Sequence, residues 1–119
     1  MRLETTISAG RLLGLTRLGW AALLLVKPDR AVTMLGGPVS SRSREVARVA
    51  GGRHLVQGAA ELVSWPCCWR LGVFTDLAHA STGVGLALHG GSWRRMAVQD
   101  AALARCFAVW GILARPQRG

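Results

Sequence analysis

The stretch at residues 8–26, SAGRLLGLTRLGWAALLLV, decides the fold of this chain. Leu and Ala dominate it, and Lys27-Pro28-Asp29 follows at once, where proline prevents simple continuation of a helix. As a helix this stretch is long enough to cross the hydrocarbon core of a bilayer, which is about 30 Å thick. We therefore predict a helix over residues 8–26 with the length of a membrane span.

Three further apolar segments of similar length follow, and Arg, Pro and Gly separate them. A short amphipathic piece at 29–35 and a loop through Gly36-Gly37-Pro38 come first. We expect the remaining helices at 45–65, 71–89 and 95–114, with Ser43 as a plausible cap and Pro66 as the end of the first of them. No strand alternation competes, and short connections favour antiparallel neighbours. The predicted fold is all-α, an antiparallel four-helix transmembrane bundle in a single domain, residues 1–119.

Composition narrows the classes of protein further. The chain has 119 residues, 50% of them apolar, which excludes general disorder and collagen. Lys and Arg number 15 against 6 Asp and Glu, a net charge of +9. The bases are spread along every segment without a basic-aromatic platform, so nucleic acid is not an expected partner. Arg2 stands beside Glu4 with no small-residue cleavage site, so we expect no removed signal peptide.

Tryptophan and small residues favour a membrane, whereas charges oppose it. Four tryptophans lie near expected helix ends, as in an interfacial belt: Trp65, Trp69, Trp93 and Trp110. Small residues suit close packing in the third helix: Ala78, Gly83, Gly85 and Gly90. In the second segment, however, six apolar residues together favour membrane insertion by roughly 3 kcal/mol, whereas Arg53 and Glu61 together oppose insertion by a larger free energy. We therefore expect insertion as a packed set of helices, with a soluble basic helical protein as the alternative.

Ionisable residues within the apolar segments form a candidate cluster. Its expected members are Arg17, Arg53, Arg105, Glu61, Asp76 and Asp100, joined by His54, Gln57 and His79. Such groups should face the bundle interior and pair with one another. Arg53, Gln57 and Glu61 recur every four residues on one helix stripe, and Asp76 and His79 share a face. We expect Asp76 to pair with Arg53 or Arg17.

Two interpretations of this cluster stay open. It is a network of salt bridges that fixes helix register, or a polar pocket for the polar end of a lipophilic molecule. In the second case Asp76 and His79 are the candidate catalytic acid and base, and Arg53 is an anion clamp. The candidate ligand-binding residues are Arg17, Arg53, His54, Gln57, Asp76 and His79. We expect no metal site and no cofactor, and expect Cys67, Cys68 and Cys106 to be reduced thiols.

Two motifs resemble a known family. Gly51-Gly52-Arg53-His54-Leu55-Val56-Gln57 matches a GxRHLxQ pattern, and Asp76-Leu77-Ala78-His79-Ala80 matches a DxxHA pattern. Both resemble segments in successive helices of a family of small multi-helix membrane proteins of actinobacteria, which has no established activity. Gly10-Arg11-Leu12-Leu13-Gly14 and Pro28-Asp29-Arg30 extend the likeness over most of the chain. The resemblance implies a four-helix membrane fold and a polar signature of Arg53, His54, Gln57, Asp76 and His79.

Together these observations predict a multi-pass protein of the cell membrane. The leading hypothesis is a non-enzymatic accessory or lipid-associated bundle, whose basic helix ends lie against anionic headgroups. The alternative is a small membrane enzyme or carrier for a lipophilic substrate. Membrane lipids are the expected partners, and a second copy of the chain or another membrane protein is a further candidate.

Overall fold

The described part of the chain is entirely helical. The computed structural model describes residues 9–115, without the side chains of residues 65–68. Within that range the helices are α2 (Ala9–Val26), α3 (Pro28–Met34), α4 (Ser41–His89) and α5 (Arg94–Leu113), and there is no strand. The all-α prediction is confirmed. The expected helices at 8–26 and 95–114 correspond to α2 and α5, although Ser8 itself lies outside the described residues.

Helix α4 differs from the sequence prediction, because it contains both segments that were expected as separate helices. Its backbone leaves helical geometry at Ser64, where φ is −147° and ψ is 49°. The expected break near Pro66 is thus present as a kink, whereas the expected gap before Leu71 is absent, because residues 65–70 are helical. A proline within a helix lacks the N–H that would bond the carbonyl four residues earlier, and a proline ring generally clashes with that carbonyl. The chain relieves this conflict by bending just before the proline, and then stays helical.

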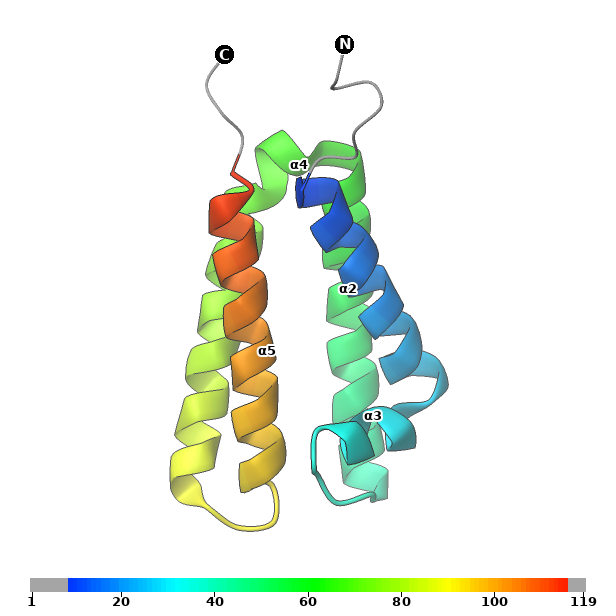
Figure 1. Cartoon of the computed structure of the whole chain (residues 1–119). Helices are drawn as coiled ribbons and strands as arrows, with labels where there is room; N and C mark the ends of the chain where they lie inside the picture. Colours follow the sequence, from blue (N-terminus) through cyan, green and yellow to red (C-terminus); the bar gives the residue numbers. More distant parts are fainter. Residues whose placement is uncertain (1–8, 116–119) are drawn as a thin grey trace.

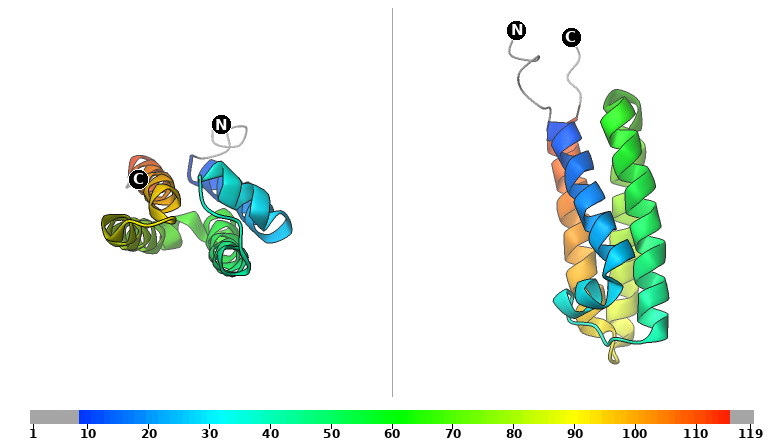
Figure 2. Two further views of the ribbon diagram at one scale, coloured as in Figure 1. Left: turned by 90° about the horizontal axis from the view of Figure 1, so that it is seen from below. Right: turned by 90° about the vertical axis from the view of Figure 1, so that its right-hand side faces the viewer.

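The kink divides α4 into two arms that organise the molecule. In Figure 1, α2 runs along the first arm (residues 41–63) and α5 runs along the second arm (residues 65–89), each antiparallel to its neighbour. The kink and the described ends nearest the two termini lie at one end of the bundle. Helix α3 and the turn at residues 90–93 lie at the other, as the two views of Figure 2 show. The result is two helical hairpins joined through α4.

Turn chemistry explains how the hairpins close. Ser40 caps α4, because its side chain accepts from the Ser43 backbone N–H while the Ser43 hydroxyl accepts from the Ser40 N–H. Ser43 had been expected as the cap itself, and it is instead the third residue of the capping box. Gly90 and Gly91 have φ values of 77° and 83°, a region that favours glycine, and they end α4 before α5 begins.

Glycines also let the helices approach closely. A Cβ atom on Gly14 of α2 would lie 3.0 Å from the Gly58 carbonyl oxygen of α4. On Gly83 it would lie 2.9 Å from the Ala101 Cβ of α5, which confirms the expected contact at that position. Gly85, however, meets nothing within 4 Å. Small residues therefore mediate helix contacts at only some of the expected positions.

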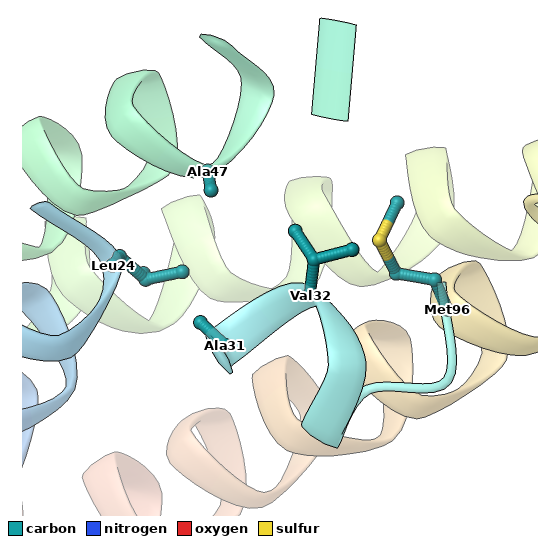
Figure 3. Packing of buried hydrophobic residues seen from close by; sticks show 5 residues of the cluster. All are labelled: Leu24, Ala31, Val32, Ala47 and Met96. Carbon is teal, nitrogen blue, oxygen red and sulfur yellow. The ribbon is translucent and has the colours of Figure 1, made fainter. Parts of the chain in front are cut away.

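Burial is inverted relative to a soluble bundle. Arg17, Glu61 and Asp76 are among the largest fully buried side chains. Many large apolar side chains instead lie on the outside, including Val63 and Leu88, which are 85% and 83% exposed. Much of the buried apolar core consists of alanines, and a small cluster at the α3 end joins Leu24, Ala31, Val32, Ala47 and Met96 (Figure 3).

Candidate functional site

Arg17 is the centre of the buried polar cluster. Its guanidinium makes a two-pronged contact with Asp76, in which Nη1 donates to Oδ1 at 2.8 Å and Nη2 donates to Oδ2. Its Nε atom forms an ion pair with the Glu61 carboxylate. All three side chains are almost completely buried. One side chain of α2 therefore connects both arms of α4, and the predicted pairing of Arg17 with Asp76 is confirmed.

Arg53 extends the network along the first arm. Its Nη1 atom donates to Gln57 Oε1 at 2.7 Å and lies 3.7 Å from Asp76 Oδ1. Gln57 in turn donates through Nε2 to the Gly72 carbonyl at 3.3 Å, which lies on the other side of the kink. The four-residue spacing that predicted a common stripe thus brings these side chains together, and the stripe holds the two arms against each other.

His54 lies deeper than its neighbour Arg53 and is 2% exposed. Its Nε2 atom is 3.0 Å from Arg53 Nη2, and its ring meets the edge of Phe107 with centroids 5.7 Å apart. Phe107 also receives the Arg17 guanidinium at 4.6 Å from its ring centroid. Sequence reasoning missed Phe107. The available signal was the spacing of two residues between Arg105 and Phe107, because that spacing places the Phe107 ring on a different face of α5 from Arg105.

His79 pairs with a residue of α5 and not with Asp76, with which it was expected to share a helix face. Its Nε2 atom pairs with Asp100 Oδ2 of α5, and both side chains remain partly exposed. Asp76, three residues earlier, is fully buried against Arg17. The shared helix face therefore does not place the candidate acid and base in one ion pair, because each finds a stronger partner on another helix. Asp100 was placed in the cluster by sequence, but not as the partner of His79.

Arg105 corrects the predicted cluster. It lies on the exposed side of α5, with Ala102 and Cys106 beside it, and outside the Arg17 network. Equal depth in the bundle suggested that it would face inward, but the buried residues of α5 nearest to it are Ala101, Ala104, Phe107 and Ala108. The charges of the Arg17 network are balanced: Arg17 and the partly exposed Arg53 are positive, and the buried Glu61 and Asp76 are negative.

The chemistry available to this network is limited by its internal pairing. Arg53, Gln57 and Glu61 line a groove of about 460 Å³ between the arms, so part of the network borders open space. However, the Arg53 and Gln57 side chains already bind each other. Within the described residues, no group of three His, Cys, Asp or Glu side chains could hold a metal ion. The arrangement is suited to holding helices together and leaves little binding capacity for an anion.

The α3 end of the bundle carries a separate, exposed ion pair. Arg44 donates to Asp29 through Nε at 2.7 Å and Nη2 at 3.1 Å. The Arg44 guanidinium lowers the pKa of Asp29 through this hydrogen bond, and Asp29 raises the pKa of Arg44 in the same way. This end is strongly basic apart from that pair, because several other arginines are exposed there: Arg30, Arg42, Arg48, Arg94 and Arg95.

Comparison with known proteins adds no family. No protein-family model, curated protein or solved structure matches the chain. The resemblance to small actinobacterial membrane proteins therefore stays a prediction, and the proposals below depend on the geometry alone.

Proposed function

We propose that this protein is a small multi-pass membrane protein without enzymatic activity, in which the network around Arg17 locks two helical hairpins together. The observation that carries the proposal is the inverted burial: Arg17, Glu61 and Asp76 are inside, while large apolar side chains such as Val63 and Leu88 are outside. In water this distribution exposes apolar surface and desolvates charges, and both are unfavourable. In hydrocarbon the exposed apolar side chains are solvated, and the charges of the Arg17 network are paired away from lipid.

Helix length supports the same proposal. Three helical segments are long and apolar enough to cross a membrane: Ala9–Val26, Trp69–His89 and Arg94–Leu113. At about 1.5 Å per residue each matches a bilayer core of about 30 Å. The first arm of α4 is less apolar, because it carries the Arg53 stripe. Its charges are compensated by Arg17 and Asp76, so this arm can enter as part of the folded set.

The basic α3 end supports an association with anionic lipid. Its exposed arginines stand near the ends of long helices, where headgroups would meet them. Each such residue near an anionic surface contributes roughly 1 kcal/mol of attraction. Arg94 and Arg95 are the clearest pair, because they are adjacent, exposed and at the start of α5. In this proposal the net charge of +9 comes from basic residues near the ends of the helices.

Membrane fractionation with an alkaline carbonate wash tests the location. We expect the protein to stay in the washed pellet and to require detergent for release. Recovery in the detergent-free supernatant would refute the membrane proposal and favour a soluble basic helical protein.

Vesicle experiments test the lipid association. Protein reconstituted with labelled phosphatidylglycerol should retain that lipid in preference to phosphatidylcholine. The doubly substituted variant Arg94→Gln/Arg95→Gln should lose part of this preference, whereas Arg105→Gln, on the exposed side of α5, should keep it. Equal retention of the two lipids by the unmodified protein contradicts the proposed association.

A further inference from the structure

A cavity that opens to the surface lies outside the Arg17 network, between the two hairpins at the α3 end. Its volume is about 200 Å³, and its walls come from all four described helices. Leu24 of α2, Val32 of α3, Ala47 of α4 and Met96 of α5 all line it, and Figure 3 shows these side chains converging from the four elements. An apolar pocket with few polar groups, built at the junction of several helices, is the usual form of a small-molecule site.

The polar part of the wall consists of the His79–Asp100 pair with Ser43 and Thr82, whose hydroxyls already donate to backbone carbonyls of their own segments. His79 and Asp100 both line the cavity, and Nε2 of His79 is bound to Asp100 Oδ2. This contact fixes one ring nitrogen of His79 and orients the imidazole. The Arg17 network does not use either residue. The cavity thus combines apolar walls with one oriented hydrogen-bonding pair, which can hold an oxygen atom of a ligand.

The cavity reaches the outer surface of the bundle. Val46 and Leu86 line it and are 48% and 43% exposed, so its mouth adjoins the apolar exterior. In the proposed membrane location this exterior faces hydrocarbon. A lipophilic molecule can therefore enter from the lipid without crossing the aqueous phase.

We propose that this cavity binds the ring-shaped head of a lipophilic molecule, with a hydroxyl or carbonyl oxygen of the ring directed to the His79–Asp100 pair. The volume fits a single ring, since a dry apolar cavity of about 150 Å³ is known to hold benzene. Trp93 and Met96 line the wall, and an aromatic face and a thioether sulfur are favourable neighbours for a ring. This inference rests on the proposed membrane location for the entry route, and it goes beyond the structural role of the Arg17 network.

Tryptophan fluorescence of the purified protein in detergent micelles gives a direct binding assay. The probe is a 1,4-benzoquinone with a ten-carbon alkyl tail, which quenches indole emission. We expect saturable quenching with one site per chain, and a large loss of this signal in Trp93→Phe. Decane added in excess should leave the saturable signal in place, because it has neither ring nor oxygen. Quenching that rises linearly with the probe-to-detergent ratio overturns the proposal.

Three variants test the site itself. Ala50 lines the cavity, and Ala50→Phe should fill it and abolish saturable binding. Ala78→Phe, on the exposed side of the same helix, is the matched control and should bind as the unmodified chain does. His79→Gln should weaken binding about tenfold while leaving the signal at saturation unchanged. Far-ultraviolet circular dichroism checks that each variant is folded.

The results for the variants and for the membrane fraction bear on different proposals. If the folded Ala50→Phe or His79→Gln protein binds the quinone with unchanged affinity, the cavity is not the binding site. If Ala50→Phe does not fold, Ala50→Leu and His79→Gln carry the same test. Failure of quinone binding by a protein that stays in the carbonate-washed membrane pellet defeats this inference alone. Recovery in the supernatant defeats the membrane proposal.

Discussion

The buried network around Arg17 allows a quantitative prediction, because its four charges sum to zero. Glu61→Gln leaves Arg17 and Arg53 against Asp76 alone, an excess of one positive charge. Arg17→Met leaves Glu61 and Asp76 against Arg53, an excess of one negative charge. Each single variant therefore buries an uncompensated charge, and breaking a buried pair in this way costs about 3–5 kcal/mol.

The double variant Arg17→Met/Glu61→Gln distinguishes charge balance from ordinary hydrogen bonding. It keeps Arg53 with Asp76, whose Nη1 and Oδ1 atoms are 3.7 Å apart, so the remaining charges face each other and sum to zero. We therefore expect it to be more stable than either single variant. Ordinary polar contacts between membrane helices average only about 0.6 kcal/mol, so they predict small and additive losses. The two hypotheses thus differ several-fold in magnitude, and only charge balance predicts a coupling between the two substitutions.

Unfolding in mixed micelles supplies the measurement. The purified protein in a mild detergent is titrated with sodium dodecyl sulfate, and the transition is followed by tryptophan fluorescence and circular dichroism. Arg105→Met is the matched control, because Arg105 lies on the exposed side of α5; we expect no loss of stability there. Losses below about 1 kcal/mol in both single variants, adding in the double variant, would refute the charge-balance argument.

Three further predictions concern packing, titration and exposure. Gly83→Leu should destabilise the protein by about 1–3 kcal/mol in the same unfolding assay, because a Cβ there lies 2.9 Å from the Ala101 Cβ, whereas Gly85→Leu meets open space and should have no such effect. The Arg44→Gln variant should return the lowered pKa of Asp29 to its ordinary range, as measured by NMR. Any stability that this ion pair contributes is present above the pKa of Asp29 in the unfolded chain, and it is lost as the pH falls through the lower pKa of Asp29 in the folded protein. A loss of stability on raising the pH would contradict the assignment. Cys106 is exposed on α5. In a variant with the two other cysteines replaced by Ser, a membrane-impermeant maleimide should label Cys106 in detergent and should label it much more slowly in intact vesicles. Equal labelling rates would show that this face of α5 is not in lipid.

Sequence reasoning predicted the elements that depend on local chemistry. The apolar stretch ending at Lys27-Pro28 gave the end of α2 correctly, because proline acts on its immediate neighbours. Near Pro66 the same residue type predicted a break correctly, but the helix bends at Ser64 and continues instead of ending. Propensity cannot decide between a helix that ends at a proline and one that bends there. That choice depends on what the following segment packs against.

The candidate site was predictable where periodicity fixed a face. The stripe of Arg53, Gln57 and Glu61 follows from a four-residue spacing, and the structure confirms their common side. The orientations of Arg105 and Asp100 were harder to predict, because the depth of a residue along a helix does not tell which side of the helix axis its side chain faces. The buried Phe107 is only two residues after the exposed Arg105 on α5. Partner choice between helices, such as His79 with Asp100, requires that rotation to be known.

Charge balance also constrains how the bundle can assemble in a membrane. The hairpin of α2 with the first arm of α4 brings together Arg17, Arg53 and Glu61, and it therefore retains one positive charge. Asp76, which neutralises it, arrives only with the second arm. Because an unpaired central charge is costly in lipid, this hairpin is not a stable intermediate by itself. We infer that the two arms must fold together, so the kink at Ser64 joins two parts of one cooperative unit.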